Sequence, residues 1–325
     1  MGDPAGCGPH ITVKSWNALR SEDVRPFFVI GDPRLYKGAI PIEVIEHPSQ
    51  APAVFAGALP VLPMKIERFE ELTPGTPFPA SGAATVESIR RATELCLSGD
   101  AAALVTNPIA KSVLYDVGFT HPGHTEFIAE LCRNDDEAFQ PVMMLVGGGL
   151  KVSLATIHVP LLRVLDHLTP SMLQKVTEIT DRSLKRDFGI ASPQIALTGL
   201  NPHAGEDGNI GTEERDLINP VAGQLRERGI NVSDARSADT VFHEALDGQF
   251  DAVIAMTHDQ GLIPVKTLDM WGGVNTTLGL PIVRTSPDHG TAFDAAAAGT
   301  CRPDSLIAAI QLAEQMVENR IRFDG

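Results

Sequence analysis

The sequence predicts an α/β protein built around a largely parallel sheet. Short apolar runs alternate along the chain with longer stretches whose apolar residues recur at helical spacing. Polar and glycine-rich motifs repeatedly follow the apolar runs, as binding residues do at the carboxyl ends of strands in α/β folds. The 325 residues are enough for about two domains of ordinary size.

The individual elements follow from these patterns in chain order. Strands are expected at 27–30, 103–106, 150–157, 195–198 and 252–256. Helices are expected at 83–97, 170–187, 217–228 and 305–321. Thr169 and Pro170 open the second of these helices, and Gly189 ends it. The GGGL stretch at 147–150 lies between two apolar runs and predicts a hairpin turn.

Composition excludes several classes of partner. The chain has 26 Lys and Arg against 41 Asp and Glu, a net charge of −15 without a basic stripe, so nucleic acid is not expected to bind. No apolar run is long enough for a membrane span, and the first residues, MGDPAGCGPH, do not resemble a signal peptide. The four cysteines lack CxxC spacing, which indicates free thiols in the cytoplasm.

Three histidines each follow an expected strand by a few residues. His158 stands in ATIHVP, His203 in LNPHAGEDG and His258 in AMTHDQG. Neutral imidazoles suit zinc and other first-row divalent metals, and three ligands leave a position open for substrate. The shared position predicts a metal site, although a histidine at a strand end more often makes a structural hydrogen bond. Asp239 and Thr240, in SADTVF, are expected either to orient a ligand or move a proton, or to cap a helix.

Several residues are candidates for binding an anionic substrate. GHTEF at 123–127 opens an expected helix with Thr125 as its cap, and helix N-termini offer free N–H groups to phosphate. Lys266 and Arg284 each follow an apolar segment, and Asn275 either binds substrate or shapes a turn. GDPAGCGP at 2–9 lacks the ending of a Walker A loop, and no strand–GxGxxG–helix unit is present. Any NAD is therefore expected to bind without the usual Rossmann fingerprint.

Six motifs, in this order, resemble the 4-hydroxythreonine-4-phosphate dehydrogenase family of vitamin B6 synthesis. They are GDPAGCGP, GHTEF, LNPHAGEDGNIGTEE, MTHDQGLIPVK, VNTTLGLPIVRTS and DHGTAFD, and they run from Gly2 nearly to Ala298. The resemblance implies an oxidoreductase with the isocitrate and isopropylmalate dehydrogenase-like fold, in which two α/β/α domains enclose a cleft. It places these domains at 1–112 plus 272–325 and at 113–271. It also implies a homodimer in which the partner completes each site.

The resemblance further implies roles for particular residues. The family's metal-binding histidines match His158, His203 and His258, with Zn²⁺, Mg²⁺ or Co²⁺ as the metal. Its substrate-binding residues match His124, Thr125, Lys266, Asn275 and Arg284. The stretch of Asp288, His289, Gly290 and Thr291 is similar to a loop that binds NAD or NADP. Asp239 and Lys111 are candidates for the general base, with a hydroxide on the metal as a third.

The implied reaction is NAD-dependent oxidation and decarboxylation of 4-phosphooxy-L-threonine to 3-amino-2-oxopropyl phosphate, in the synthesis of pyridoxine and pyridoxal phosphate. The nearest alternative is a related dehydrogenase of a phosphorylated sugar acid, such as 4-phosphothreonate, or of a cyclic dihydrodiol. The candidates for phosphate binding favour a phosphorylated substrate over a dihydrodiol. A metal-dependent hydrolase or aldolase without NAD and a non-catalytic metabolite-binding protein are more distant alternatives.

Two positions depart from the family pattern. A short strand usually precedes the GDPAG-like motif, whereas Met1 here directly precedes Gly2. Either the printed start lies downstream of the natural one, or a sheet strand is truncated. An acidic residue is common where His10 stands, so no role is assigned to that position.

Overall fold

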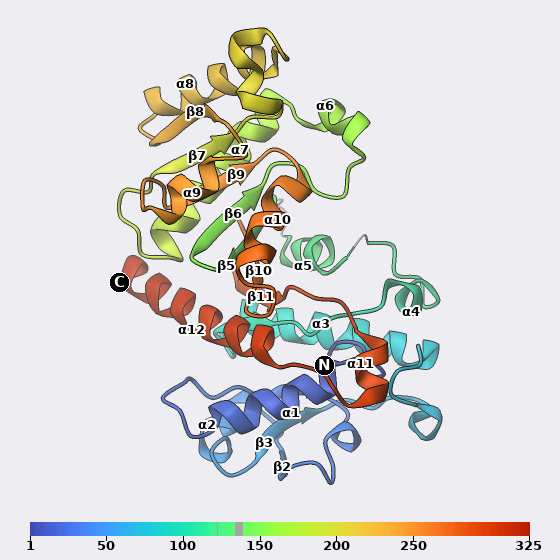
Figure 1. Ribbon diagram of the computed structural model, residues 1–325. Coiled ribbons are helices and arrows are strands. Elements are labelled where there is room, and N and C mark those ends of the chain that lie inside the picture. The colour runs from blue at the N-terminus through green and yellow to red at the C-terminus, as the bar shows by residue number, and fades with distance from the viewer. Residues whose placement is uncertain (122, 134–138) are drawn as a thin grey trace. The chain divides into compact units, whose positions relative to one another are not determined.

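The computed structural model describes residues 1–121, 123–133 and 139–325, and it has the expected α/β fold. Contacts between Cα atoms divide the chain into two compact units (Figure 1). Unit 1 contains residues 1–141 and 280–317, and unit 2 contains residues 142–279 and 318–325. These limits differ from the expected ones, mainly because residues 113–141 group with the first unit.

The sheet of unit 2 is mostly parallel. Its strands are β5 (Val142–Gly147), β6 (Leu150–Leu154), β7 (Ile195–Thr198), β8 (Val232–Arg236), β9 (Ala252–Ala255) and β10 (Val274–Leu278), in the order β10–β5–β6–β9–β7–β8. The last four strands of this order run parallel, and β5 is antiparallel to both of its neighbours. Gly148 and Gly149 join β5 to β6, so the hairpin turn predicted at 147–150 is confirmed.

Helices cover both faces of this sheet. They are α6 (Val164–His167), α7 (Pro170–Arg186), α8 (Asn219–Glu227), α9 (Val241–Leu246) and α10 (His258–Leu268). Successive strand residues alternate between two apolar clusters. Leu197 and Ile254 pack with α7 and α8, whereas Ala196 and Val253 pack with α9 and α10. Both faces are therefore buried, as parallel strands require, and α10 runs beside β5, β6 and β9 (Figure 1).

Unit 1 contains two parallel groups of strands. In the first, β1 (Val29–Gly31), β2 (Ile42–Val44) and β3 (Leu59–Pro63) have the order β1–β3–β2, and in the second β4 (Ala103–Val105) pairs with β11 (Val283–Pro287). The helices are α1 (Gly8–Leu19), α2 (Ala51–Val54), α3 (Gly82–Leu97), α4 (Lys111–Tyr115), α5 (His124–Cys132), α11 (Phe293–Ala298) and α12 (Asp304–Asp324). About the last two turns of α12, from residue 318 on, belong to unit 2. Leu104 and Val105 of β4 pack into different clusters, so this group is also covered on both faces.

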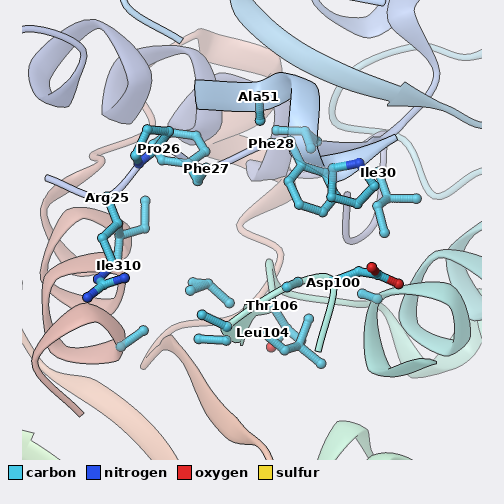
Figure 2. Close-up of a pocket in the computed structure, with 18 of the residues that line it drawn as sticks. Arg25, Pro26, Phe27, Phe28, Ile30, Ala51, Asp100, Leu104, Thr106 and Ile310 are labelled. Carbon is cyan, nitrogen blue, oxygen red and sulfur yellow. The ribbon is translucent and has the colours of Figure 1, made fainter. Parts of the chain in front are cut away.

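An apolar cavity of about 540 Å³ lies inside unit 1. Figure 2 shows Ile30 of β1 and Leu104 of β4 on opposite sides of it. Within the described residues, β1 and β4 each end their group of strands, so each has one edge without a partner strand. Met1 also lines the cavity, and burial lowers the pKa of its amino group to about 5.

The structure confirms the expected elements, with shifted ends. The strand expected at 150–157 ends at Leu154, and the helix expected at 217–228 is divided into a π-helical turn (Glu214–Ile218) and α8. β2, β3, β8, β10 and β11 were not expected, because their short runs lack a distinctive period. All four cysteines are free. In the part of the chain that is described, no helix is long and apolar enough to cross a bilayer.

Candidate active site

Three neighbouring parallel strands of unit 2 lead to the candidate metal ligands. The strands are β6, β9 and β7, in that order across the sheet, and they are followed by His158, His258 and His203 respectively. Parallel strands end at a common edge, and ligands of α/β proteins bind there. The three histidines therefore start from the same edge of one sheet.

His158 and His258 lie side by side. The centroids of their rings are 5.7 Å apart. Two imidazoles that bind one zinc ion at about 2.0–2.1 Å have ring centres roughly 5 Å apart. Nδ1 of His258 lies 2.8 Å from Oδ1 of Asp259, so Nε2 is the ring atom that can face a metal. The pair therefore fits two ligand positions of a divalent metal.

His203 does not join this pair within one chain. Its neighbour is Asp239, which follows β8, the strand next to β7. A hydrogen bond from the Ser237 hydroxyl lowers the pKa of Asp239, and His203 adds a smaller effect in the same direction. Among the residues described, no three His, Cys, Asp or Glu side chains converge on a metal position. One chain thus brings two of the predicted ligands together and places the third beside Asp239.

The loop that carries His203 has a left-handed backbone. Residues 203–207 all have φ between 44° and 78°. Outside glycine, this conformation costs about 1–2 kcal/mol for each residue. The buried carboxylate of Glu214 holds the start of the loop, because its Oε1 accepts the N–H groups of Leu200 and Asn201 at 2.8 and 2.7 Å. Glu214 was not predicted from the sequence.

Unit 1 contains a second group of candidate residues, here called the anion pocket and formed by His124, Thr106 and Arg284. Arg284, on β11, is 3% exposed, and its Nη2 donates to Oγ1 of Thr106 at 2.8 Å. His124 is the first residue of α5, and its Nε2 is enclosed without a hydrogen-bond partner in the described structure. A buried cation beside an imidazole at a helix N-terminus is suited to an anion. Thr106 was not predicted, although its polar side chain at the end of β4 is the expected kind of signal.

Burial sets the charge states in the anion pocket. It lowers the pKa of Arg284 to about 10, and Glu126 opposes this shift. It also lowers the pKa of His124 well below its usual range, and the positive charge of Arg284 adds to the effect. At neutral pH the pocket therefore contains a cationic guanidinium and a neutral imidazole that can donate one N–H.

The predicted cap of α5 is wrong. Gly123 occupies the N-cap position without a side-chain hydrogen bond, and Thr125 lies within the first turn. The N–H groups of that turn are thus not taken by a capping side chain. Lys111, the first residue of α4, lies nearby, since a Cβ at Gly123 would be 4.0 Å from its Cε. The candidate base Lys111 is therefore a neighbour of the anion pocket.

The remaining predicted substrate-binding residues belong to unit 2. Lys266 is half-buried and lies about two turns after His258 on α10. Asn275, in β10, lies opposite Leu145 of β5. The predicted set is thus divided between the units, with His124, Thr125 and Arg284 in unit 1.

The predicted cofactor loop at 288–291 packs against the GDPAGCGP motif inside unit 1. The N–H of Cys7 donates to the carbonyl oxygen of Thr291 at 2.8 Å. Gly6 must be glycine, because a Cβ there would lie 2.9 Å from the same oxygen. The Ser305 hydroxyl accepts the N–H of Asp288 at 3.0 Å. Two motifs from opposite ends of the sequence therefore form one surface, on which His289 and Gly290 are exposed.

Solved structures match the chain over nearly its whole length. A 4-hydroxythreonine-4-phosphate dehydrogenase from Klebsiella pneumoniae matches with a TM-score of 0.85 and 37% identity, covering 98% of each chain. A terephthalate 1,2-cis-dihydrodiol dehydrogenase from Burkholderia xenovorans matches with a TM-score of 0.67 and 28% identity, covering 97% of this chain and 96% of the other. Fold and site thus define an α/β enzyme of the dehydrogenase class, an oxidoreductase.

Sequence comparison gives the family. A family model described as pyridoxal phosphate biosynthetic protein PdxA matches residues 23–313. A relative from Maricaulis maris, named 4-hydroxythreonine-4-phosphate dehydrogenase, is 49% identical over 329 residues and covers 98% of this chain and 97% of its own. A relative of the same name from Methylorubrum populi is 48% identical over 326 residues, covering 98% and 93%. The chain belongs to the PdxA family of pyridoxal phosphate biosynthesis, which confirms the resemblance in its motifs.

Proposed function

We propose that the chain is a NAD-dependent and divalent-metal-dependent dehydrogenase that converts 4-phosphooxy-L-threonine to 3-amino-2-oxopropyl phosphate. The anion pocket is the observation that carries this proposal, because it combines the buried cation Arg284 with a neutral His124 at the start of α5. Burying a cation is costly, and a bound anion offsets that cost. The pocket therefore favours a phosphorylated substrate, in agreement with the names of the relatives at 48–49% identity.

The chain's own groups account for binding the substrate. Arg284, His124 and the first-turn N–H groups of α5 would bind phosphate oxygens. Lys266 and Asn275 would bind the remaining polar groups. Asp239, which lies near His203 and whose pKa is lowered by the hydrogen bond from Ser237, and Lys111, which lies near the anion pocket, would be the two candidates for the general base.

Two non-protein groups would be held by residues already described. His158 and His258 would hold Zn²⁺, Mg²⁺ or Co²⁺, with Asp259 fixing the orientation of His258. When bound, the metal would supply Lewis acidity that favours loss of the substrate hydroxyl proton and stabilises negative charge on the carbonyl oxygen as CO₂ leaves. The surface formed by residues 288–291, on which His289 and Gly290 are exposed, would hold NAD or NADP through its side chains and backbone groups.

The third metal ligand would come from the partner in a homodimer. Within one chain His203 does not join the His158–His258 pair. Exposed apolar side chains follow both members of the pair: Leu161 and Leu162 come after His158, and Ile263, Leu268, Met270 and Trp271 come after His258. Apolar surface of this kind marks an interface. A second copy that covers it would bring its own His203 to the pair.

The reaction is tested by NADH formation. Purified protein is given 4-phosphooxy-L-threonine or 4-phosphothreonate, with and without a chelator, and metal is then added back. We expect chelator-sensitive turnover with strong preference for the first substrate. Preference for 4-phosphothreonate would leave the proposed sites in place but would mean that the enzyme acts on a phosphorylated sugar acid instead. Turnover that is unaffected by complete metal removal, or no NADH from either substrate with metal bound, would contradict the proposal.

Mixed dimers test the shared metal site. His203→Ala and His258→Ala are each expected to abolish metal-dependent turnover. Refolding the two variants together is expected to restore about a quarter of the parental turnover, because each mixed dimer regains one intact site. His158→Ala mixed with His258→Ala should restore none, because both belong to one pair. If the mixture of His203→Ala and His258→Ala regains no turnover, the two chains do not share a metal site. Full activity of any single variant would exclude the metal role of that histidine.

A further inference from the structure

The loop after β7 is wound around one buried carboxylate. Glu214 is 3% exposed, and its Oε1 accepts the N–H groups of Leu200 and Asn201. Its Oε2 accepts Nδ2 of Asn201 at 3.1 Å. The same Nδ2 of Asn201 also donates to Oε2 of Glu213, at 2.7 Å. Leu200 and Asn201, which lead into Pro202 and His203, are thus held in place by carboxylates.

Glycines allow the left-handed turn to approach Glu214. A Cβ at Gly205 would lie 2.5 Å from Oε2 of Glu214 and 2.7 Å from the carbonyl oxygen of Gly211. A Cβ at Gly199 would lie 2.8 Å from Cα of Ala204 and 3.2 Å from Oε1 of Glu214. No side chain fits between the turn and the carboxylate. Glu214 is therefore the fixed centre of the turn.

The core of unit 2 holds this centre in place. Glu214 begins the π-helical turn that ends at the fully buried Ile218 and leads into α8. Turns of this kind are rare and occur often at functional sites. The exposed residues of the loop, including His203, thus depend on a carboxylate that belongs to a rigid element.

We propose that Glu214 is a positioning residue for His203. The proposal rests on the metal role proposed for His203. The non-glycine residues of 203–207 are held against their backbone preference, so loss of the Glu214 contacts would let the turn relax to a right-handed or extended form. The imidazole would then leave the loop in another direction. Glu214 acts through the backbone and touches neither metal nor substrate.

The test compares variants of the full-length protein, with Co²⁺ as the probe. Glu214→Ala is expected to weaken Co²⁺ binding about 10–100-fold, as for other residues that orient metal ligands, and to shift the His203 imidazole resonances in NMR spectra. Glu214→Gln keeps an acceptor oxygen for the N–H groups of Leu200 and Asn201, so it should recover most of the affinity. Gly205→Ala should reproduce the loss, because the added Cβ displaces the same carboxylate.

A matched glycine and two outcomes complete the test. Gly223→Ala, in α8, adds a Cβ in open space and should change neither affinity nor resonances. If Glu214→Ala leaves Co²⁺ affinity and the His203 resonances unchanged, the proposal is wrong even if the melting temperature falls. If His203→Ala binds Co²⁺ as tightly as the parent, the proposed metal role fails, and the His203 resonances alone decide on Glu214. If Glu214→Ala does not fold, Gly205→Ala is used in its place.

Discussion

Units 1 and 2 differ in how completely one chain builds their candidate sites. In unit 1, Arg284 is almost fully buried, and its partner Thr106 and neighbour His124 come from the same unit. In unit 2, His158 and His203 are exposed, and the described residues of one chain do not gather three ligands. The residues of the anion pocket thus lie together within one chain, whereas the described residues of one chain bring only two of the three histidines of unit 2 together.

The largest effect is expected on the free energy of unfolding, from the amino group of Met1. This group is buried in unit 1, so it tests how closely unit 1 is packed. Burial lowers its pKa from 8.0 to about 5. The unfolded chain therefore takes up a proton that the folded state resists, so the free energy of unfolding should fall as pH drops from 8 to 5, by up to about 4 kcal/mol. Urea unfolding of free and amino-acetylated protein at both pH values measures this term. Equal pH dependence in the two forms would show that the amine is solvated.

The cavity beside Met1 provides a second variant for the same prediction. A short extended apolar segment fused before Met1 would turn the amine into an amide and could pair with the bare edges of β1 and β4. It should raise the melting temperature more than acetylation does. The same segment with proline at consecutive positions lacks the backbone N–H donors for both strands and serves as the control. Equal melting temperatures for the two fusions would rule out strand pairing in the cavity.

An intermediate effect tests whether the two sites are separable. Arg284→Met removes the buried cation and is expected to lower kcat/KM for the phosphorylated substrate about 10–100-fold, the size of a lost charge-assisted contact. Co²⁺ affinity should not change, because the histidine pair belongs to the other unit. Arg322→Met removes an exposed arginine and is the matched control. An equal loss of Co²⁺ affinity in Arg284→Met would mean that the sites are coupled, and the contrast drawn between them would not stand.

The smallest effect is expected at Asp259, next to His258. Its side chain is 79% exposed, so solvent replaces much of its influence on the imidazole. Asp259→Asn should therefore weaken Co²⁺ binding by less than about 10-fold, at the low end for such neighbours. Asp247→Asn, at the exposed His243–Asp247 pair, should have no effect. A loss as large as that of His258→Ala would mean that the open side of unit 2 is more tightly organised than its exposure indicates.

The sequence predicted features that repeat along the chain. The strand-end positions of His158, His203 and His258 were visible because each apolar run is followed by a polar motif. The order of the strands in the sheet could not be predicted from the sequence. Because of that order, His258 lies beside His158, whereas His203 lies near Asp239.

Contacts between distant segments were also beyond prediction. Thr106 meets Arg284 only because β4 pairs with β11, although these residues are 178 positions apart. Glu214 was missed because its partners are backbone N–H groups, which leave no signature in side-chain types. The cap of α5 was predicted wrongly because Thr125 has the right chemistry, but Gly123 holds the position where the backbone turns.

The discontinuity of unit 1 has a consequence for synthesis on the ribosome. Residues 142–279 of unit 2 form an almost continuous stretch, whereas unit 1 needs residues 280–317 to complete it. Domains fold as units once their residues have emerged. β4 therefore cannot pair until β11 has been made, and Thr106 cannot bind Arg284, which is translated 178 positions later. β4 and Thr106 thus reach their native partners only late in synthesis, and nascent β4 exposes both strand edges during that interval.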